Sequence, residues 1–514
     1  MQSVDQKTTP LVRKMHQLNK QIFQGIMLLI LFLIFFTTFR HGMEWSLLFS
    51  AMIALIVAMI PEGLPAVLTM ILSMGVHEMA RENAIIKGMP SVETLGSMTV
   101  ICSDKTGTLT ENRMTVTALY SGTSPLPVDE IGDGHIAQNF AVNSTATVEM
   151  ADGRPDFIGN PTECALLMAL VNSGVDYRAR RAAAKVAYVY PFSSETKNMT
   201  TVLEVGKKFV AYTKGSPEKI MSFCQMPPER RAELEAAIEE FQKRACRVIG
   251  FAHRTLDEAP NFESEREFLE AQMEFDGFVA ITDPLRGDVK DAVDRCRSAG
   301  IDLKILTGDN IVTASAIARD LGVLDEAHIA VEAREVEEIS DEELAKILPK
   351  IRVIARSTPS VKMRVVNMLR SQGNVVAVTG DGINDAPALK NADVGVAMGI
   401  TGTEVSKEAS DIILLDDSFT TIVRAVEWGR GIFENFLRFI QFQLTVNVSS
   451  VVVVLACILT GAASPFTALE LLWINLIMDG PPALTLGLEP MRKNLMRRKP
   501  TPRNAPLVSK RMLT

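Results

Sequence analysis

Cysteine is scarce in this chain, which has six cysteines among 514 residues and no Cys-x-x-Cys pair. So few scattered cysteines exclude a disulfide framework and a cysteine zinc site, and they indicate reduced cytosolic thiols. The sequence also has no Gly-x-x-x-x-Gly-Lys-Ser/Thr motif, so a phosphate-binding P-loop is excluded. An excess of positive charge is missing as well. The formal net charge is −8, which argues against nucleic acid as a partner.

Long apolar runs are abundant by contrast, and hydrophobic residues make up 47% of the chain. Four stretches are each long enough to cross a bilayer. They are residues 22–39, residues 45–76, the uncharged stretch between Arg438 and Glu470, and residues 471–488. We therefore expect four membrane spans. If the basic segments near both ends stay in the cytosol, residues 77–432 face the cytoplasm.

The stretch Asp104-Lys105-Thr106-Gly107-Thr108 follows the apolar run Met98-Thr99-Val100-Ile101-Cys102. A carboxylate at the end of a buried strand can attack a phosphoryl group when a cation and nearby donors neutralise the γ-phosphate. Lys105, the hydroxyl residues and the backbone around Gly107 offer such donors. Taken alone, the stretch is more simply interpreted as a solvated turn after a strand.

Two further apolar runs end in the same way, at Thr307-Gly308-Asp309 and at Thr379-Gly380-Asp381. Each run is typical of a buried parallel strand with a loop at its carboxyl end. In a doubly wound sheet such loops converge on one crevice. The three segments together therefore predict one phosphoryl-transfer site.

Six segments in this order resemble a P-type cation-transporting ATPase of the calcium-pump type. They are Pro61-Glu62-Gly63-Leu64-Pro65, the segment that begins at Asp104, Lys214-Gly215-Ser216-Pro217-Glu218, Asp283-Pro284-Leu285-Arg286, Thr307-Gly308-Asp309 and Thr379-Gly380-Asp381-Gly382-Ile383-Asn384-Asp385. The resemblance implies an α/β fold with transmembrane helices. Its parts are a haloacid-dehalogenase-like (Rossmann-like) phosphorylation domain, an inserted α+β nucleotide-binding domain and four membrane spans.

The resemblance also implies the domain boundaries. We expect two transmembrane helices in 1–80, the phosphorylation domain in 81–118 and 276–430, the nucleotide-binding domain in 119–275, two further transmembrane helices in 431–490, and a basic cytosolic tail in 491–514. The long excursion between the two parts of the phosphorylation domain is typical of an inserted domain with its own core.

The cofactors implied are ATP and Mg²⁺, and Asp104 is the implied phosphoryl acceptor. The implied catalytic residues are Asp104, Lys105, Thr106, Thr307, Gly308, Asp309, Lys362, Asn384 and Asp385, with Mg²⁺ held by Asp104, the Thr106 carbonyl and Asp381. Thr106 stands where haloacid-dehalogenase hydrolases usually carry an acid that later activates water. An aspartyl-phosphate at Asp104 is therefore expected to persist.

A second set of residues is implied to bind the nucleotide, with Phe192 stacked on adenine. The set is Thr162, Glu163, Phe192, Lys197, Lys214, Arg247, Asp283, Arg286 and Arg356. Taken singly, each of these residues is as typical of a core or a solvated surface. Their order along the chain favours the binding role.

Glu62 lies between two prolines in an apolar stretch, and an ionisable group at bilayer depth is usually functional. Pro65 offers no backbone donor and so frees carbonyls upstream. Carbonyls and a carboxylate form a hard oxygen site, which suits Ca²⁺. The ligands implied by the resemblance are Glu62, Asn475, Asp479 and the carbonyls of Val57, Ala58 and Ile60, with Asn447 as an additional candidate.

The second ion site of two-ion pumps has lost its ligands, because Ser450 and Met478 stand where that site carries a glutamate and a threonine. This pattern resembles the plasma-membrane-type calcium pumps, which carry one ion per ATP. The family's actuator domain and its remaining spans have no counterpart in the sequence. We therefore expect a part of a longer pump, truncated at both ends, that needs the actuator domain for full turnover.

The expected function is ATP-driven Ca²⁺ transport through an aspartyl-phosphate, by a multi-pass membrane protein in the lipid bilayer whose catalytic domains are cytoplasmic. Two alternatives stay open. One is a P-type pump for Na⁺, K⁺ or H⁺. The other is a non-pumping membrane protein that binds nucleotide or an ion.

Overall fold

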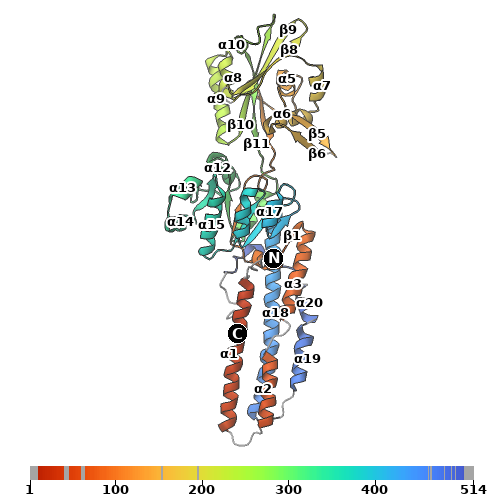
Figure 1. Cartoon of the computed structure of the whole chain (residues 1–514), viewed down its shortest axis with the longest axis vertical. Helices are drawn as coiled ribbons and strands as arrows, with labels where there is room; N and C mark the ends of the chain where they lie inside the picture. The colour runs from red at the N-terminus through yellow and green to blue at the C-terminus, as the bar shows by residue number, and fades with distance from the viewer. Residues whose placement is uncertain are drawn as a thin grey trace. The chain divides into compact units, whose positions relative to one another are not determined.

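The computed structural model describes residues 10–39, 45–59, 64–151, 154–193, 196–460, 462, 466–479, 481–487, 489–492 and 494–502. The chain forms two compact units, which are described separately. The first unit comprises Met1–Leu109, Gly287–Gly308 and Val323–Thr514, and the second comprises Thr110–Arg286 and Asp309–Gly322. Figure 1 shows both units and labels many of their helices and strands.

The first unit contains an eight-stranded sheet with the strand order β1-β17-β16-β15-β2-β12-β14-β13. Its strands are β1 (Ala84–Ile86), β2 (Val100–Ser103), β12 (Asp302–Leu306), β13 (Ile329–Glu332), β14 (Ile351–Ala355), β15 (Val376–Gly380), β16 (Val394–Met398) and β17 (Ile412–Leu414). All neighbours pair in parallel except β1 and β17. Every residue of β2, β15 and β16 is buried, as expected of parallel strands covered on both faces.

Short helices alternate with these strands. They are α4 (Pro90–Gly96), α11 (Val289–Ser298), α13 (Ala333–Glu338), α14 (Asp341–Ile347), α15 (Pro359–Ser371), α16 (Ala386–Asn391) and α17 (Glu404–Ala409). α15 begins where the sequence provides a cap, because the Thr358 hydroxyl accepts a hydrogen bond from the Val361 N–H. Its apolar face, including Val365, packs in one cluster with Val378 of β15. This alternation of parallel strands and helices is Rossmann-like, as predicted.

The same unit also carries the apolar helices. They are α1 (Pro10–Phe39), α2 (Trp45–Met59), α3 (Leu64–Arg81), α18 (Phe419–Thr460), α19 (Ala468–Asp479) and α20 (Pro481–Gly487). Among the described residues, two helical segments are long and apolar enough to cross a membrane, Gln17–Phe36 and Phe419–Thr460. The apolar stretches 45–76 and 471–488 overlap α2 and α3 and α19 and α20, respectively, and residues 60–63, 480 and 488 lie outside the described residues.

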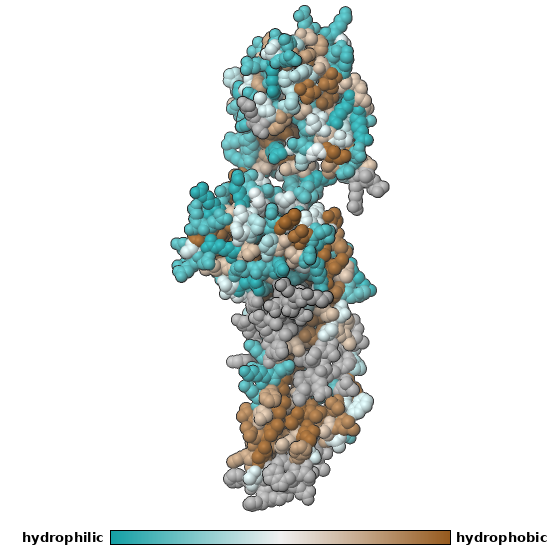
Figure 2. All heavy atoms as spheres, in the orientation of Figure 1, coloured by the Kyte–Doolittle hydropathy of each residue, from teal (hydrophilic) through white to brown (hydrophobic). Residues whose placement is uncertain are grey.

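Helices α1, α2, α18 and α19 share a core cluster that includes Leu33, Ala58, Val454 and Leu471. Large apolar side chains also cover the outside of this part, where Figure 2 shows a brown band. Phe23, Leu28, Phe35, Phe49, Val452 and Trp473 are among those exposed. A contiguous apolar surface of this kind is typical of helices that face lipid.

The second unit is built on a seven-stranded antiparallel sheet with the order β4-β3-β11-β10-β9-β8-β7, and β5 pairs with β6 beside it. The strands are β3 (Thr115–Ser121), β4 (Ser124–Leu126), β5 (Thr147–Ala151), β6 (Arg154–Ile158), β7 (Lys185–Tyr190), β8 (Asn198–Val205), β9 (Lys208–Gly215), β10 (Arg247–Leu256) and β11 (Glu274–Thr282). The helices are α5 (His135–Val142), α6 (Pro161–Asn172), α7 (Tyr177–Ala183), α8 (Pro217–Phe223), α9 (Pro228–Lys243), α10 (Arg266–Leu269) and α12 (Ile311–Asp320). Phe140, Leu166 and Phe251 are fully buried in its core, so this α+β unit has a hydrophobic centre of its own.

Candidate functional site

The central strands of the parallel sheet bring the three predicted loops to one edge. Ser103 at the end of β2 pairs with Thr379 of β15 on one side and with Ile305 of β12 on the other. The hydroxyl oxygens of Ser103 and Thr379 lie 3.0 Å apart and are buried. Asp104 and Asp381 follow these strands directly, so register alone places their carboxylates side by side.

One buried lysine holds two of the carboxylates at this edge. The Lys362 ammonium lies 2.9 Å from Asp104 Oδ2 and 2.6 Å from Asp385 Oδ1. The other oxygen of Asp104 accepts a hydrogen bond of 2.7 Å from the Lys105 N–H. Carboxylate oxygens of Asp104, Asp381 and Asp385 all lie within 4.8 Å of one another. Two of the three carboxylates therefore contact one ammonium group, and the third lies beside them.

Burial and the crowding of negative charge change the pKa values of these groups. Burial, together with the charges of Asp104 and Asp385, raises the pKa of Asp381 to about 6. Burial also raises the pKa of Asp104, although Lys362 opposes this shift. Burial alone would lower the pKa of Lys362, but the two carboxylates raise it. The site therefore has an excess of hard oxygen ligands, which fits Mg²⁺.

Two glycines let the loops come this close. Gly107 has a φ of +74°, and a Cβ there would lie 2.8 Å from Asp381 Oδ2. A Cβ on Gly380 would overlap the side chain of Asp385. A side chain at either position would push the carboxylates apart, so both glycines are needed for the cluster.

The remaining predicted catalytic residues lie in different surroundings. Thr307 is buried, and its carbonyl accepts a hydrogen bond of 2.8 Å from the Ser357 N–H. Lys105 is buried, Thr106 is half-buried, and Gly308 and Asn384 are exposed. Asp309 belongs to the second unit.

No sequence motif singled out Asp417, which shapes the loop after β16. This buried carboxylate accepts hydrogen bonds from the N–H groups of Gly399, Ile400 and Thr401 and from the Thr401 hydroxyl. A Cβ on Gly107 would lie 3.7 Å from that hydroxyl, so the loop borders the cluster. The only available signal was a pair of acids, Asp416-Asp417, directly after a short apolar strand.

A second cluster lies in the antiparallel unit. Glu163 Oε1 lies 2.6 Å from the Lys214 ammonium, which also donates to the Asn143 carbonyl at 2.5 Å. Glu163 Oε2 accepts hydrogen bonds from the N–H and hydroxyl of Thr145 and from two neighbouring groups. Arg247 donates to the Thr162 hydroxyl at 2.6 Å. Four of the residues predicted to bind nucleotide therefore converge from α6, β9 and β10.

The loop between β7 and β8 joins this cluster. The Ser216 N–H donates to the Lys197 carbonyl, and a Cβ on Gly215 would lie 2.5 Å from the same oxygen. Gly215 thus allows the loop to pack beside Lys214. Phe192 and Lys197 are exposed on the loop, and the Phe192 side chain is 61% exposed. An exposed aromatic ring offers a surface on which a planar ligand can stack.

Three residues predicted to bind nucleotide lie apart from this cluster. Asp283 accepts hydrogen bonds from the Thr110 hydroxyl at 2.5 Å and from the Arg113 N–H at 3.1 Å. Arg286 donates to the Thr110 carbonyl, so Asp283 and Arg286 tie together the two strands that begin and end the second unit. Arg356 is exposed in the first unit, with a positive φ of 51° and its guanidinium 3.9 Å from Glu332.

Part of the predicted ion site lies in the described helices. The Asn475 amide donates a hydrogen bond of 3.0 Å to the Val57 carbonyl, which joins α19 to the end of α2. Ala58 and Asn447 are buried, and the Ser450 hydroxyl is satisfied within its helix by the Val446 carbonyl. Ile60 and Glu62 lie outside the described residues, as do the side chains of Met478 and Asp479.

Two family profiles match the chain. The first, described as P-type ATPase, cytoplasmic domain N, matches residues 135–288, and the second, described as cation transporting ATPase, C-terminus, matches residues 463–514. Residues 135–288 lie almost entirely in the antiparallel unit with the Glu163 and Lys214 cluster.

Full-length relatives are also similar. Calcium-transporting ATPase PAT1 of Dictyostelium discoideum is 42% identical over 484 residues, covering 85% of this chain and 43% of the relative. Plasma membrane calcium-transporting ATPase 4 of Homo sapiens is 40% identical over 482 residues, covering 85% of this chain and 39% of the relative. The chain thus spans about two fifths of the length of these relatives. It belongs to the family of P-type cation-transporting ATPases.

Proposed function

We propose that this chain carries the catalytic and ion-binding core of an ATP-driven Ca²⁺ pump of the plasma-membrane type. The observation that supports this most is the cluster at the end of β2 and β15, where Asp104 meets Lys362, Asp381 and Asp385. The relatives at about 40% identity are calcium-transporting ATPases, which favours Ca²⁺ over Na⁺, K⁺ or H⁺ as the transported ion.

In this proposal an Asp104 oxygen forms a bond to the γ-phosphorus of ATP while the bond to the β,γ-bridging oxygen breaks, and ADP leaves with that electron pair. Lys362 positions the nucleophile and neutralises negative charge on the phosphoryl oxygens. Lys105, Thr307 and Gly308 line the phosphoryl group, and Asn384 and Asp385 support the corner near Asp381. Asp309 acts at the nucleotide-facing rim.

Mg²⁺ fits the three carboxylates because the described site has more hard anionic oxygens than its single lysine neutralises. Asp104, the Thr106 carbonyl and Asp381 would hold it. When bound, it supplies positive charge against the γ-phosphate. Thr106 offers no carboxylate to activate water, so the phosphorylated Asp104 lacks a general base at this position.

The second unit serves as the inserted nucleotide-binding domain in this proposal. Phe192 stacks on adenine, while Lys197, Lys214 and Arg247 supply positive charge and Thr162 and Glu163 complete the pocket. Asp283 and Arg286 both contact Thr110, the residue at which the second unit begins. Arg356, which lies near Glu332, shapes the outer rim of the phosphorylation domain.

The apolar helices form four membrane spans in this proposal, namely α1, α2 with α3, α18, and α19 with α20. Pro65 offers no backbone donor and so frees carbonyls upstream of it, which suits cation binding at bilayer depth. One Ca²⁺ is bound by Glu62, Asn475, Asp479 and the carbonyls of Val57, Ala58 and Ile60, with Asn447 beside them. The phosphorylation and nucleotide-binding domains then face the cytoplasm.

The test is phosphorylation of the purified chain by γ-labelled ATP with Mg²⁺, followed by an acid quench. We expect acid-stable label that requires micromolar Ca²⁺, and none in Asp104→Asn. Label at the wild-type level in Asp104→Asn would exclude Asp104 as the nucleophile. Label that depends on Na⁺, K⁺ or pH and not on Ca²⁺ would indicate that the transported ion is not Ca²⁺. Nucleotide binding without any label would favour a non-pumping protein.

A further inference from the structure

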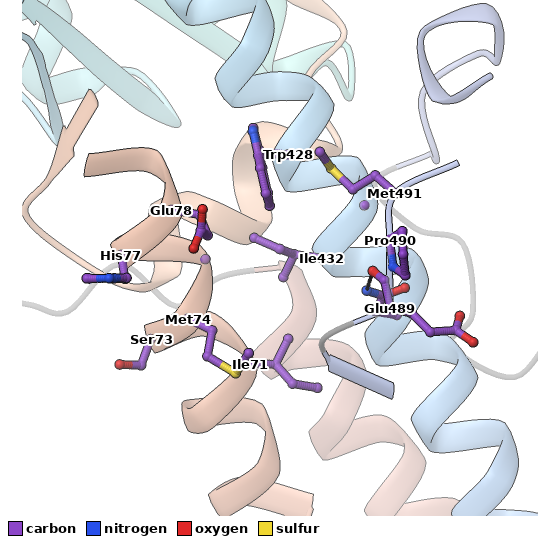
Figure 3. Close-up of a pocket in the computed structure, with 13 residues that line it drawn as sticks. Ile71, Ser73, Met74, His77, Glu78, Trp428, Ile432, Glu489, Pro490 and Met491 are labelled. Atoms are coloured by element: carbon purple, nitrogen blue, oxygen red, sulfur yellow. Dashed lines mark hydrogen bonds between the residues drawn. The ribbon is translucent and has the colours of Figure 1, made fainter. Parts of the chain in front are cut away.

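Polar groups near the sheet-proximal end of the apolar helices are mostly paired. A cavity of about 570 Å³ lies there between α3, α18 and residues 489–491 (Figure 3). Of the polar groups on its wall, Glu78 pairs with Arg81, Glu489 pairs with Arg438, and Asn435 donates to the Glu489 carbonyl. These three groups therefore already have partners within the chain.

Two buried amides further along α18 differ from this pattern. Gln443 is 1% exposed and Asn447 is 3% exposed. In the part of the chain that the structure describes, neither the oxygen nor the nitrogen of either amide has a hydrogen-bond partner. Asn447 was already a candidate ligand, whereas no motif pointed to Gln443. The two amides lie one helical turn apart on α18, and each has two unpartnered polar atoms.

Such groups are costly among apolar helices. Leaving one buried polar group without a hydrogen-bond partner destabilises the folded state. A structural role for Gln443 would require a partner, as Asn435 and Asn475 have. A ligand that bound these amides would offset the cost of burying them without a partner. Because amide oxygens are hard ligands, a cation such as Ca²⁺ is the natural partner.

The position of Gln443 agrees with this role. α3 runs toward the sheet and α18 runs away from it, and a Cβ on Gly75 would overlap the side chain of Ile432, so these two residues are level. Eleven residues along α18 from Ile432 lead to Gln443, and eleven residues back along α3 from Gly75 lead to Leu64. Each of these eleven-residue lengths of helix is about 16 Å long. Gln443 is thus level with the start of α3.

Asn447 lies one turn, about 6 Å, farther from the sheet than Gln443. It therefore lies about one turn beyond the level of Leu64, the first residue of α3, on the side away from the sheet. Gln443 therefore lies on the sheet side of Asn447, and Asn447 belongs to the proposed ion site.

We infer that Gln443 is a further ligand of the transported cation, supplying its amide oxygen on the catalytic side of Asn447. This inference rests on the proposed function, since it adds one oxygen to the same site. Ca²⁺ takes six to eight oxygen ligands, so one additional amide belongs naturally to a single-ion site.

The test is equilibrium ⁴⁵Ca²⁺ binding to the purified full chain, with Gln443→Leu compared with Gln441→Leu. Gln441 is two residues away on the same helix and is exposed, so it is a chemically matched control. We expect Gln443→Leu to raise the Kd about tenfold, which corresponds to about 1.4 kcal/mol. Gln441→Leu should bind like the wild type, and Gln443→Glu should bind at least as tightly because it keeps an oxygen ligand.

Thermal unfolding without Ca²⁺ separates binding from structure. Gln443→Leu removes an unpartnered amide, so its unfolding temperature should equal or exceed that of the wild type. An unchanged Kd, an equal loss in both leucine variants, or a lowered unfolding temperature without Ca²⁺ would overturn the inference. If the wild-type chain itself binds no Ca²⁺, the proposed function fails instead.

Discussion

Lys362 and Lys214 are both buried and both paired with carboxylates, yet their pKa values shift in opposite directions. Two carboxylates raise the pKa of Lys362 against the effect of burial. Burial lowers the pKa of Lys214, whose one carboxylate, Glu163, is shared with several other donors. The first site has an excess of negative charge, which favours a cation. The second is neutral at its centre, and Arg247 lies beside it, which favours an anion.

The largest expected effect is the loss of Lys362. Lys362→Met leaves three carboxylates without a cation, and breaking a buried pair in this way costs about 3–5 kcal/mol of unfolding free energy. Lys214→Met should cost about 1–3 kcal/mol, because Glu163 keeps its backbone and hydroxyl donors. Hydrogen exchange in β2 and in β9 reports the two units separately.

Mg²⁺ sharpens this difference. Mg²⁺ should restore the hydrogen-exchange protection of β2 in Lys362→Met, where oxygen ligands are in excess. It should leave the protection of β9 in Lys214→Met unchanged. Equal costs in the two variants, or an equal response to Mg²⁺, would break the comparison.

A smaller effect concerns the pH dependence of the antiparallel unit. Burial alone would raise the pKa of Glu163, but Lys214 and the neighbouring donors lower it below its ordinary value. The folded state therefore binds fewer protons than the unfolded state near pH 4.5. The stabilisation is full above that pH and is lost as the pH falls through the folded pKa.

The measurement is the urea midpoint of the wild type compared with Glu163→Gln. We expect the wild type to be more stable at pH 7 and the difference to shrink below about pH 4.5. A difference that is constant from pH 7 to pH 3 would show that Glu163 contributes shape and hydrogen bonds without its charge.

The smallest effect concerns adenine. Phe192→Ala should weaken ATP binding about 2- to 10-fold, since aromatic stacking contributes about 0.5–1.5 kcal/mol beyond area burial. Phe268→Ala is the matched control, because Phe268 on α10 is also exposed in this unit but packs against Arg254 of β10. Calorimetric titration of ATP gives both values, and an equal loss in both variants would place adenine elsewhere.

The sequence predicted the parallel sheet well because buried parallel strands are continuous apolar runs that end in polar loops. Asp104 and Asp381 could be paired from this pattern alone, since strand register brings both to one edge. Lys362 could be assigned only by resemblance. It lies on a helix, 258 residues from Asp104 in sequence, and a lysine there is equally typical of a solvated face.

Other features depend on contacts that leave no local pattern. Asp417 binds three backbone N–H groups through a loop conformation that propensity does not reveal. Asp283 and Arg286 contact Thr110 because the chain crosses between units there. Gln443 differs from the exposed Gln441 only in the helix face that it occupies.

Reductive trapping tests the central claim most directly, because borohydride converts an aspartyl-phosphate to homoserine at the phosphorylated position. The purified chain is incubated with ATP, Mg²⁺ and Ca²⁺, reduced, digested and examined by peptide mass spectrometry. The account predicts homoserine at position 104 and aspartate at positions 381 and 385. Homoserine at either of those two positions, with Asp104 unchanged, would contradict it.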